Sequence, residues 1–124
     1  MLPLILDLSG RKVVIFGGGP VGARKAAFFQ GECRVVMASR SFGREIGNLD
    51  VERVSVDLGT ASDGGLGALM EGAFLVIAAV GDPAVNDRIR RIARASGILC
   101  NSASGGPGDV IIPSVERGGL TSSR

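Results

Sequence analysis

Five short apolar runs recur along the chain, each followed by glycine or by a polar turn. Most are continuous runs of Val, Ile, Leu and Ala, which is typical of parallel strands that are buried on both faces. The run at 51–56 alternates instead, as expected of a strand nearer the edge of a sheet, whereas the run at 73–80 suits a central strand. The predicted strands occupy residues 12–17, 34–39, 51–56, 73–80 and 98–101.

Helical patterns separate several of these runs, and the predicted helices occupy residues 20–31, 66–70 and 82–97. The last of them begins with Asp82 as its N-cap and Pro83 in its first turn. Its predicted buried face consists of Val85, Ile89, Ile92 and Ala93. Strands that alternate with helices predict an α/β fold built as a doubly wound parallel sheet.

The remaining segments are expected to connect or extend this sheet. Residues 4–8 are expected to lie against it, and the Gly- and Ser-rich residues 60–67 to form a connection. A length of 124 residues predicts a single domain, with its core at 1–109. Residues 110–124 are expected to start a carboxyl-terminal extension.

Composition argues against several function classes. Aromatic residues make up only 4% of the chain and the net charge is +2, so a nucleic-acid site built on stacking and basic patches is not expected. The longest apolar run, 73–80, is too short to cross a membrane, and the amino terminus lacks a basic leader, which favours a cytoplasmic location. Cys33 and Cys100 are far apart and histidine is absent, so no metal site is predicted.

The cations are almost all arginine, because lysine occurs only at positions 12 and 25. Arginine binds carboxylates and phosphates in a two-pronged geometry, which favours an anionic small molecule as partner. The alternative is a solvated, arginine-rich surface. That alternative suits best the arginines of the predicted helix 82–97, at positions 88, 90, 91 and 94.

The strongest chemical signal is a glycine motif that follows the first predicted strand. Gly17, Gly19 and Gly22 satisfy G-x-G-x-x-G, the pattern of dinucleotide-binding turns, with Pro20 and Val21 opening the helix. The first glycine permits the tight turn, the second lets the backbone approach a pyrophosphate, and the third lets helix and strand pack closely. The alternative interpretation is a tight connection without a ligand.

Further cofactor contacts are predicted where other strands end. Arg40 and Ser41 follow the second strand, where an acid would read the ribose of NAD and an arginine would accept the 2′-phosphate of NADP. The pattern alone therefore points toward NADP, unless Arg40 simply faces water. Ala79 and Val80 end the central strand and leave room for a ligand, and Asn101 ends the last strand at the same edge.

Blocks of sequence at 3–4, 7–8, 10–11, 17–25, 75–79, 82–86, 97–101 and 109–114 together resemble the precorrin-2 dehydrogenases, the NAD-dependent domain of siroheme synthases. The resemblance implies oxidation of precorrin-2, an octacarboxylate tetrapyrrole, to sirohydrochlorin with NAD as hydride acceptor. In some members of the family ferrous iron is then inserted. The resemblance also implies a homodimer, and it favours NAD over NADP.

The chain departs from the family pattern at the expected general base. Where the family has an acid shortly after the strand-ending Asn, this chain has Ser104, so Asp109 is the predicted base and Ser104 a substrate contact. Asp109 could instead be only a turn residue. Gly22 replaces a common alanine. The chain also lacks most of the family's dimerisation and helical regions, so we expect self-association through 110–115 and poor turnover. A non-catalytic dinucleotide-binding module, a redox sensor or a truncated fragment is the alternative.

Overall fold

The fold is a five-stranded parallel sheet covered by helices, and the computed structural model describes residues 2–103 and 112. The elements are, in chain order, β1 Lys12–Phe16, α1 Pro20–Phe29, β2 Arg34–Ser39, the 3-10 helix η1 Arg44–Ile46, β3 Glu52–Ser55, α2 Asp63–Met70, β4 Leu75–Ala78, α3 Pro83–Ala95 and β5 Leu99–Ser102. No helix within these described residues is long and apolar enough to cross a membrane.

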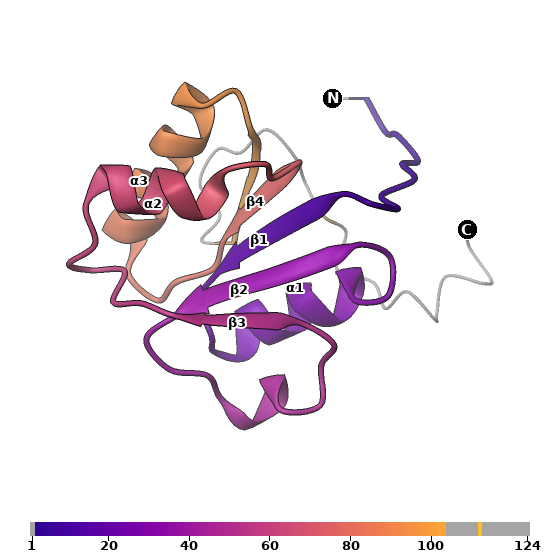
Figure 1. Ribbon diagram of the computed structural model, residues 1–124, viewed down its shortest axis with the longest axis horizontal. Coiled ribbons are helices and arrows are strands. Elements are labelled where there is room, and N and C mark those ends of the chain that lie inside the picture. The colour runs from indigo at the N-terminus through magenta and orange to yellow at the C-terminus, as the bar shows by residue number, and fades with distance from the viewer. Residues whose placement is uncertain (1, 104–111, 113–124) are drawn as a thin grey trace.

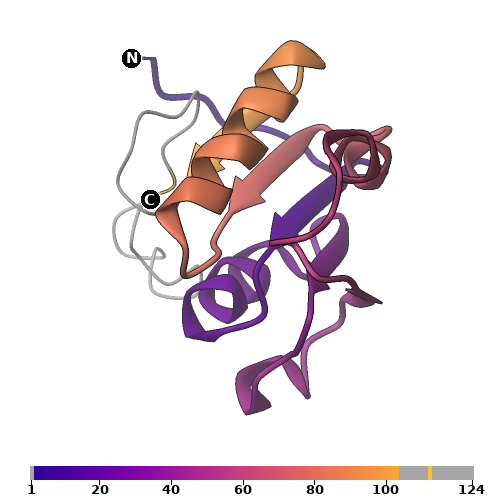
Figure 2. The same cartoon turned by 90° about the vertical axis from the view of Figure 1, so that its left-hand side faces the viewer.

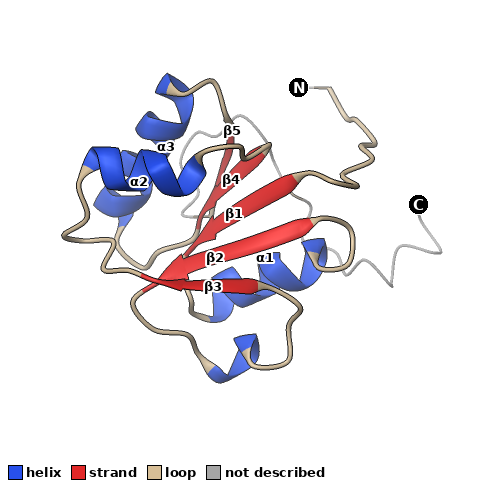
Figure 3. Ribbon diagram, viewed as in Figure 1, coloured by secondary structure: helices blue, strands red, loops and turns tan. Residues whose placement is uncertain are grey.

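The strands lie in the order β3-β2-β1-β4-β5, and every neighbouring pair is parallel. Helix α1 covers one face of the sheet, and α2 and α3 cover the other (Figures 1 and 3). The view turned by 90° shows α3 running alongside β4 (Figure 2). The doubly wound parallel sheet predicted from the sequence is therefore confirmed. Its strand order reverses between β1 and β4, which marks the edge where such folds bind ligands.

Each face of the sheet has its own buried cluster, because successive side chains of a strand point to opposite faces. On the α2 and α3 face, Val14 and Phe16 of β1 pack with Leu66 and Ile89. On the α1 face, the buried residues include Val13, Ile15, Ala23, Ala26 and Phe29. All four residues of β4 are buried, as expected of a central strand.

Two elements differ from their predicted bounds. Strand β4 covers only Leu75–Ala78 rather than 73–80, because the chain leaves the strand ladder after the Ala79 N–H bonds to the Phe16 carbonyl oxygen. Helix α2 begins at Asp63, inside the segment expected to be a connection. The Ser62 side chain caps it by accepting a hydrogen bond from the Gly65 N–H, and this cap offsets the low helix propensity of its glycines.

Two other sequence expectations are corrected. Segment 4–8 does not lie against the sheet along its length, because Leu4, Ile5 and Leu6 are exposed and only Leu8 packs on the core. In α3 the fully buried side chains are Asn86, Ile89 and Ala93. The predicted face had Val85 and Ile92 in place of Asn86, and these two are only partly buried.

Of the carboxyl-terminal segment expected to be extended, only Ile112 lies among the described residues. Ile112 is partly buried and packs against the buried cluster on the α1 face of the sheet. At this position the chain therefore contacts its own domain. The division into a core at 1–109 and an extension at 110–124 stays a prediction.

Candidate functional site

A cavity of about 480 Å³ lies at the carboxyl edge of the sheet, where β1 and β4 end side by side. The chain departs from β1 toward β2 and from β4 toward β5, so the two following connections separate and leave a crevice at this point. The residues that line the cavity are Gly17, Gly18, Gly19, Pro20, Val21, Ser39, Ser41, Gly43, Ala79, Val80, Gly81 and Ala103. Five of the predicted cofactor residues, together with Gly17 and Gly19 of the motif, are thus brought to one place.

Two glycines of the motif are required by close packing. Gly17 has φ +128°, and a Cβ atom built there would lie 2.3 Å from the Ala79 carbonyl oxygen. A Cβ atom on Gly22 would lie 2.4 Å from the Gly17 carbonyl oxygen. Both distances are shorter than real contacts, so only glycine lets β1, α1 and the end of β4 approach as they do. Gly22 packs against Gly17 in the turn but is not one of the residues that line the cavity.

Gly19 has a different environment, because a Cβ atom there would meet nothing within 4 Å. Gly19 is the N-cap of α1 and has φ −93°, a backbone conformation that any residue can adopt. Neither packing nor strain within the described protein requires glycine here. The open space in front of Gly19 fits the close approach of a ligand to the backbone, as the motif predicts.

The partial positive charge at the start of α1 is also not balanced by a side-chain cap or an acidic residue. Among the three α-helices of the described residues, α1 is the one without a side-chain cap, and its first turn carries no acid. By contrast, Ser62 caps α2 and Asp82 caps α3 through its bond to the Ala84 N–H. The unbonded N–H groups at the start of α1 and the positive end of its dipole therefore remain available to an anion, as a pyrophosphate requires.

Gly18 lines the cavity, although the motif pattern does not specify this position. Its carbonyl oxygen accepts a 2.8 Å hydrogen bond from the Gly43 N–H, and a Cβ atom on it would lie 2.1 Å from the Ser41 carbonyl oxygen. The glycine loop is therefore joined to the segment that follows β2. The run of three consecutive glycines at 17–19 was the available signal, since the motif explains only two of them.

The segment after β2 forms the side of the cavity nearest to β2. Ser39, Ser41 and Gly43 line it, so the predicted Ser41 is in place. Arg40 lies between two lining residues but is not one of them. Its side chain is 81% exposed, and Nη1 lies 3.5 Å from Oδ2 of Asp57. A cofactor contact by Arg40 stays a prediction.

The opposite wall of the cavity is formed by residues 79–81, just after β4. Val80 is held by Asn86 of α3, whose Oδ1 accepts from the Val80 N–H at 2.8 Å and whose Nδ2 donates to the Val80 carbonyl oxygen at 2.7 Å. Sequence reasoning assigned Asn86 no function. Its signal is a polar residue three positions before Ile89 and seven before Ala93, in the middle of an apolar helix face.

The remaining predicted site residues divide into two groups. Asn101 is buried in β5, beside the cavity rather than in its lining, where it lies opposite Ile77. The predicted base Asp109 and the predicted substrate contact Ser104 fall outside the described residues. None of the twelve lining residues carries an ionisable side chain, so the part of the cavity that the structure describes offers a binding surface and no general base.

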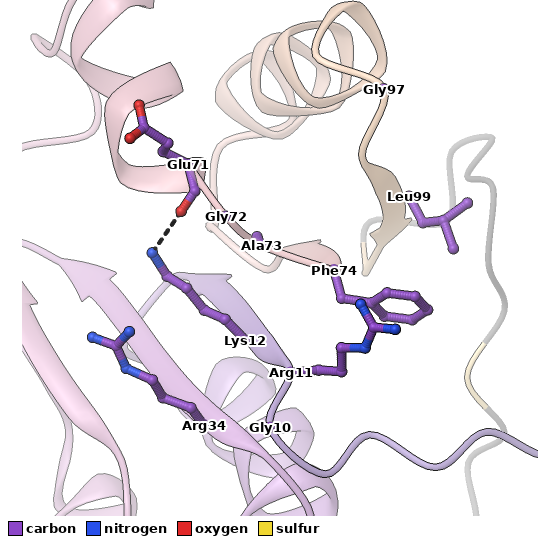
Figure 4. A pocket seen from close by; sticks show the side chains of 10 residues that line it. All are labelled: Gly10, Arg11, Lys12, Arg34, Glu71, Gly72, Ala73, Phe74, Gly97 and Leu99. Carbon is purple, nitrogen blue, oxygen red and sulfur yellow. Dashed lines mark hydrogen bonds between the residues drawn. The ribbon is translucent and has the colours of Figure 1, made fainter.

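A second cavity, of about 520 Å³, lies at the amino edge of the sheet (Figure 4). Three cations, Arg11, Lys12 and Arg34, stand along it. Lys12 Nζ donates to the Glu71 carbonyl oxygen at 2.9 Å, directly after α2, while the Glu71 carboxylate points away from it (Figure 4). Arg11 lies over the Phe74 ring, 5.4 Å from its centroid.

Each of these cations has a partner in the protein: Lys12 at the end of α2, Arg11 on the Phe74 ring and Arg34 in its pair with Glu52. In strand-helix-strand units the helices run antiparallel to the strands, so their carboxyl ends gather at the amino edge of the sheet. Lys12 satisfies a carbonyl group at such an end. Arg34 is already paired with Glu52, and the hydrogen bond between them lowers the pKa of the Glu52 carboxyl.

Comparison with known proteins agrees with this geometry. Residues 4–114 match a protein family described as "Putative NAD(P)-binding". The chain is 49% identical to a precorrin-2 dehydrogenase of Methanosarcina barkeri, in a match that covers 96% of this chain and 55% of that protein. It is 32% identical to a siroheme synthase of Sodalis glossinidius, with coverage of 81% and 21%.

Among solved structures, the fold is similar to that of SirC, a precorrin-2 dehydrogenase. The TM-score is 0.71 at 23% sequence identity, and the match covers 92% of this chain and 55% of that one. This likeness supports the fold. The chain spans about half the length of the dehydrogenases that it matches.

Proposed function

The chain belongs to the NAD(P)-binding family that it matches, and we propose that it is the nucleotide-binding domain of a precorrin-2 dehydrogenase that uses NAD. The observation that carries the proposal is the open space at Gly19, at the uncapped start of α1 and at the reversal of the strand order. Neither packing nor backbone strain in the described residues explains a glycine at this position. A pyrophosphate that lies against the backbone would explain the glycine.

Each part of the cavity has a role in this proposal. The backbone of residues 18–20 and the first turn of α1 would hold the pyrophosphate. Ser39, Ser41 and Gly43 would hold the adenosine end, where two hydroxyl groups can bond to ribose. Residues 79–81 and Ala103 would form the wall beside the nicotinamide. When bound, NAD supplies the acceptor for a hydride, and the protein supplies orientation and shelter from water.

The proposed substrate is precorrin-2, on the basis of the 49% identity to a precorrin-2 dehydrogenase. It would lie beyond the nicotinamide end of the cavity, where the chain continues into residues 104–111. Loss of a hydride must be accompanied by loss of a proton, and the described lining residues carry no group to accept it. Asp109 therefore stays our proposed base, with Ser104 as a substrate contact.

Turnover and binding are measured separately to test the proposal. Calorimetric titration with NAD and with NADP reports cofactor binding, and the absorbance of NADH formed with precorrin-2 reports dehydrogenation. We expect NAD to bind readily and precorrin-2 to be oxidised slowly. NAD binding without turnover would instead identify a non-catalytic dinucleotide-binding module. Absence of binding would refute the site itself. Ferrous iron added after oxidation tests the iron insertion that the family resemblance implies.

We also propose a homodimer, supported by apolar surface on the described residues. Leu4, Ile5 and Leu6 are exposed next to β1, and Leu99 is 40% exposed on β5, the last strand of the sheet. An edge strand with apolar side chains is prone to pair with another chain. Light scattering as a function of concentration tests this assembly, which a constant monomer mass at high concentration would exclude.

A further inference from the structure

The amide of Asn86 makes an unusual pair of hydrogen bonds, because both go to the backbone of a single residue. Its Oδ1 accepts from the Val80 N–H at 2.8 Å, and its Nδ2 donates to the Val80 carbonyl oxygen at 2.7 Å. Asn86 is only 1% exposed, although it lies in the first turns of a helix that is largely polar on its outer side. A buried amide of this kind is expensive unless both ends are bonded, and both ends are.

The residue that Asn86 holds lies at a structural transition. Strand β4 ends at Ala78, and the Ala79 N–H makes the last bond to β1, through the Phe16 carbonyl oxygen. Among the described residues, Val80 is the first after β4 whose N–H and carbonyl groups bond to a side chain instead of a strand. The Asn86 amide makes the two hydrogen bonds to Val80 that a neighbouring strand would otherwise make.

The same residue belongs to the cavity wall. Residues 79–81 line the cavity beside the glycine loop, because they follow β4, the strand that pairs with β1. Ala79 also packs against that loop, since a Cβ atom built on Gly17 would lie only 2.3 Å from the Ala79 carbonyl oxygen. A shift of Val80 would therefore change both the width of the cavity and the packing of Ala79 against Gly17.

We propose that Asn86 is a positioning residue for the dinucleotide, which holds residues 79–81 at a fixed separation from the glycine loop and thereby sets the affinity for NAD. The proposal rests on the proposed function, because it assumes that the cavity binds NAD. Asn86 acts through Val80 and does not line the cavity itself. The Ala79 N–H bonds to the Phe16 carbonyl oxygen and the Val80 N–H bonds to Asn86, so a backbone donor for a ligand on this wall would come from Gly81.

The substitution Asn86→Asp tests this role through its dependence on pH. A protonated carboxyl group has the same shape as the amide, donating to the Val80 carbonyl and accepting from the Val80 N–H. The ionised group can only accept, and it faces that carbonyl with a negative charge. Burial raises the pKa of such a carboxyl, so it is protonated at about pH 5 and ionised at about pH 9.

Few other groups interfere with this titration. Strands β4 and β5, which pack against α3, carry no charged side chain, and the Cys100 thiol is their one titratable group. On α2, Asp63 is paired with Arg88. On α3 itself, Asp82 caps the helix and Asp87 is paired with Arg90. The substituted carboxyl therefore reports on its bonds to Val80.

We expect the NAD dissociation constant of Asn86→Asp to equal that of the wild type at about pH 5 and to be about tenfold higher at about pH 9. The wild-type constant serves as the reference at each pH. Ile89→Val is the matched control, because Ile89 is fully buried one turn further along the same helix and its apolar side chain makes no hydrogen bond to Val80. It should lower stability at both pH values without changing the dissociation constant.

Equal affinity of folded Asn86→Asp and wild type at both pH values would overturn the inference while leaving the proposed function intact. Failure of the wild type to bind NAD would instead overturn the proposed function. If Asn86→Asp unfolds at high pH, hydrogen exchange of the wild type gives a second test. The Val80 N–H should then exchange slowly, like the amides of β4, and exchange as fast as an open loop would contradict its bond to Asn86.

Discussion

The two edges of the sheet carry cavities of similar size and opposite chemistry. The cavity at the carboxyl edge, about 480 Å³, is lined by glycines, small residues and serines, and none of its lining residues is ionisable. The cavity at the amino edge, about 520 Å³, is slightly larger and carries Arg11, Lys12 and Arg34. Volume and positive charge would both favour the amino edge as the site for an anionic cofactor. The glycine motif lies at the other edge.

Helix direction explains the difference. Helices between parallel strands place their amino ends at the carboxyl edge, where α1 is left without a side-chain cap. They place their carboxyl ends at the amino edge, where Lys12 bonds to the carbonyl group of Glu71, the residue directly after α2. Lys12 at the amino edge thus complements the carboxyl end of α2, whereas the open backbone at the carboxyl edge is our proposed site for an anion. Each of the following substitutions tests one side of this comparison.

The largest expected effect is that of Gly19→Val on nucleotide binding. A Cβ atom at this position meets no atom of the described residues within 4 Å, so the domain should fold while NAD affinity falls about a hundredfold or more, as phosphate contacts are lost. Calorimetry gives the affinity and thermal unfolding gives the stability. Gly64→Val is the control, since Gly64 in α2 also has nothing within 4 Å of a built Cβ atom. Unchanged affinity in Gly19→Val would remove the pyrophosphate from this loop.

The next effect is that of Gly18→Ala, which should damage both folding and binding. Its Cβ atom would lie 2.1 Å from the Ser41 carbonyl oxygen and force the glycine loop away from the segment after β2. We expect a loss of about 1–3 kcal/mol in the free energy of unfolding and about tenfold weaker NAD binding. Urea denaturation and calorimetry measure the two quantities. Wild-type stability in this variant would show that the contact between the two segments is not required.

A smaller change is expected from Arg40→Asp at the adenosine end. The substitution replaces a cation by an acceptor for the ribose 2′-hydroxyl, so the ratio of NADP to NAD dissociation constants should rise several-fold. The effect is limited because Arg40 is exposed and already lies 3.5 Å from Asp57. Both constants are measured in wild type and variant, and an unchanged ratio would place Arg40 outside the site.

At the amino edge, Lys12→Met should change stability and leave binding alone. It removes the hydrogen bond to the Glu71 carbonyl at the end of α2 while keeping most of the apolar stem. We expect the free energy of unfolding to fall by about 0.5–1 kcal/mol and the NAD dissociation constant to stay at its wild-type value. Weaker NAD binding in this variant would mean that the amino edge takes part in the site.

The smallest expected effect is that of low pH on the stabilisation by the Arg34–Glu52 ion pair. The bond from Arg34 holds the pKa of Glu52 below its usual value of 4.5, so the pair stabilises the fold above that value and loses its effect as the pH falls through the lowered pKa. Both side chains are more than half exposed, so the contribution is small. Urea midpoints of Glu52→Gln and wild type should differ slightly at neutral pH and converge in acid. A gap that widens in acid would contradict the pairing.

The sequence predicted the alternation of strands and helices and the glycine motif, because both depend on residues close together in the chain. It did not predict the roles of Gly18 and Asn86. Gly18 must be glycine because it lies against Ser41, more than twenty positions away in the chain. Asn86 is needed because β4 ends shortly before Val80, to whose backbone the Asn86 amide bonds. The start of α2 was also missed, since its glycines disfavour a helix until Leu66 and Met70 are buried against the sheet.

We expect NAD to bind at the carboxyl edge of the sheet and not at the amino edge. Backbone amide chemical shifts recorded during a titration with NAD test it most directly, because they report on both edges in one experiment. We expect large shifts at Gly17, Gly19, Gly43 and Gly81, with the amides of Gly10, Lys12 and Gly72 unmoved. Shifts confined to the amino edge, or equal shifts at both edges, would contradict it.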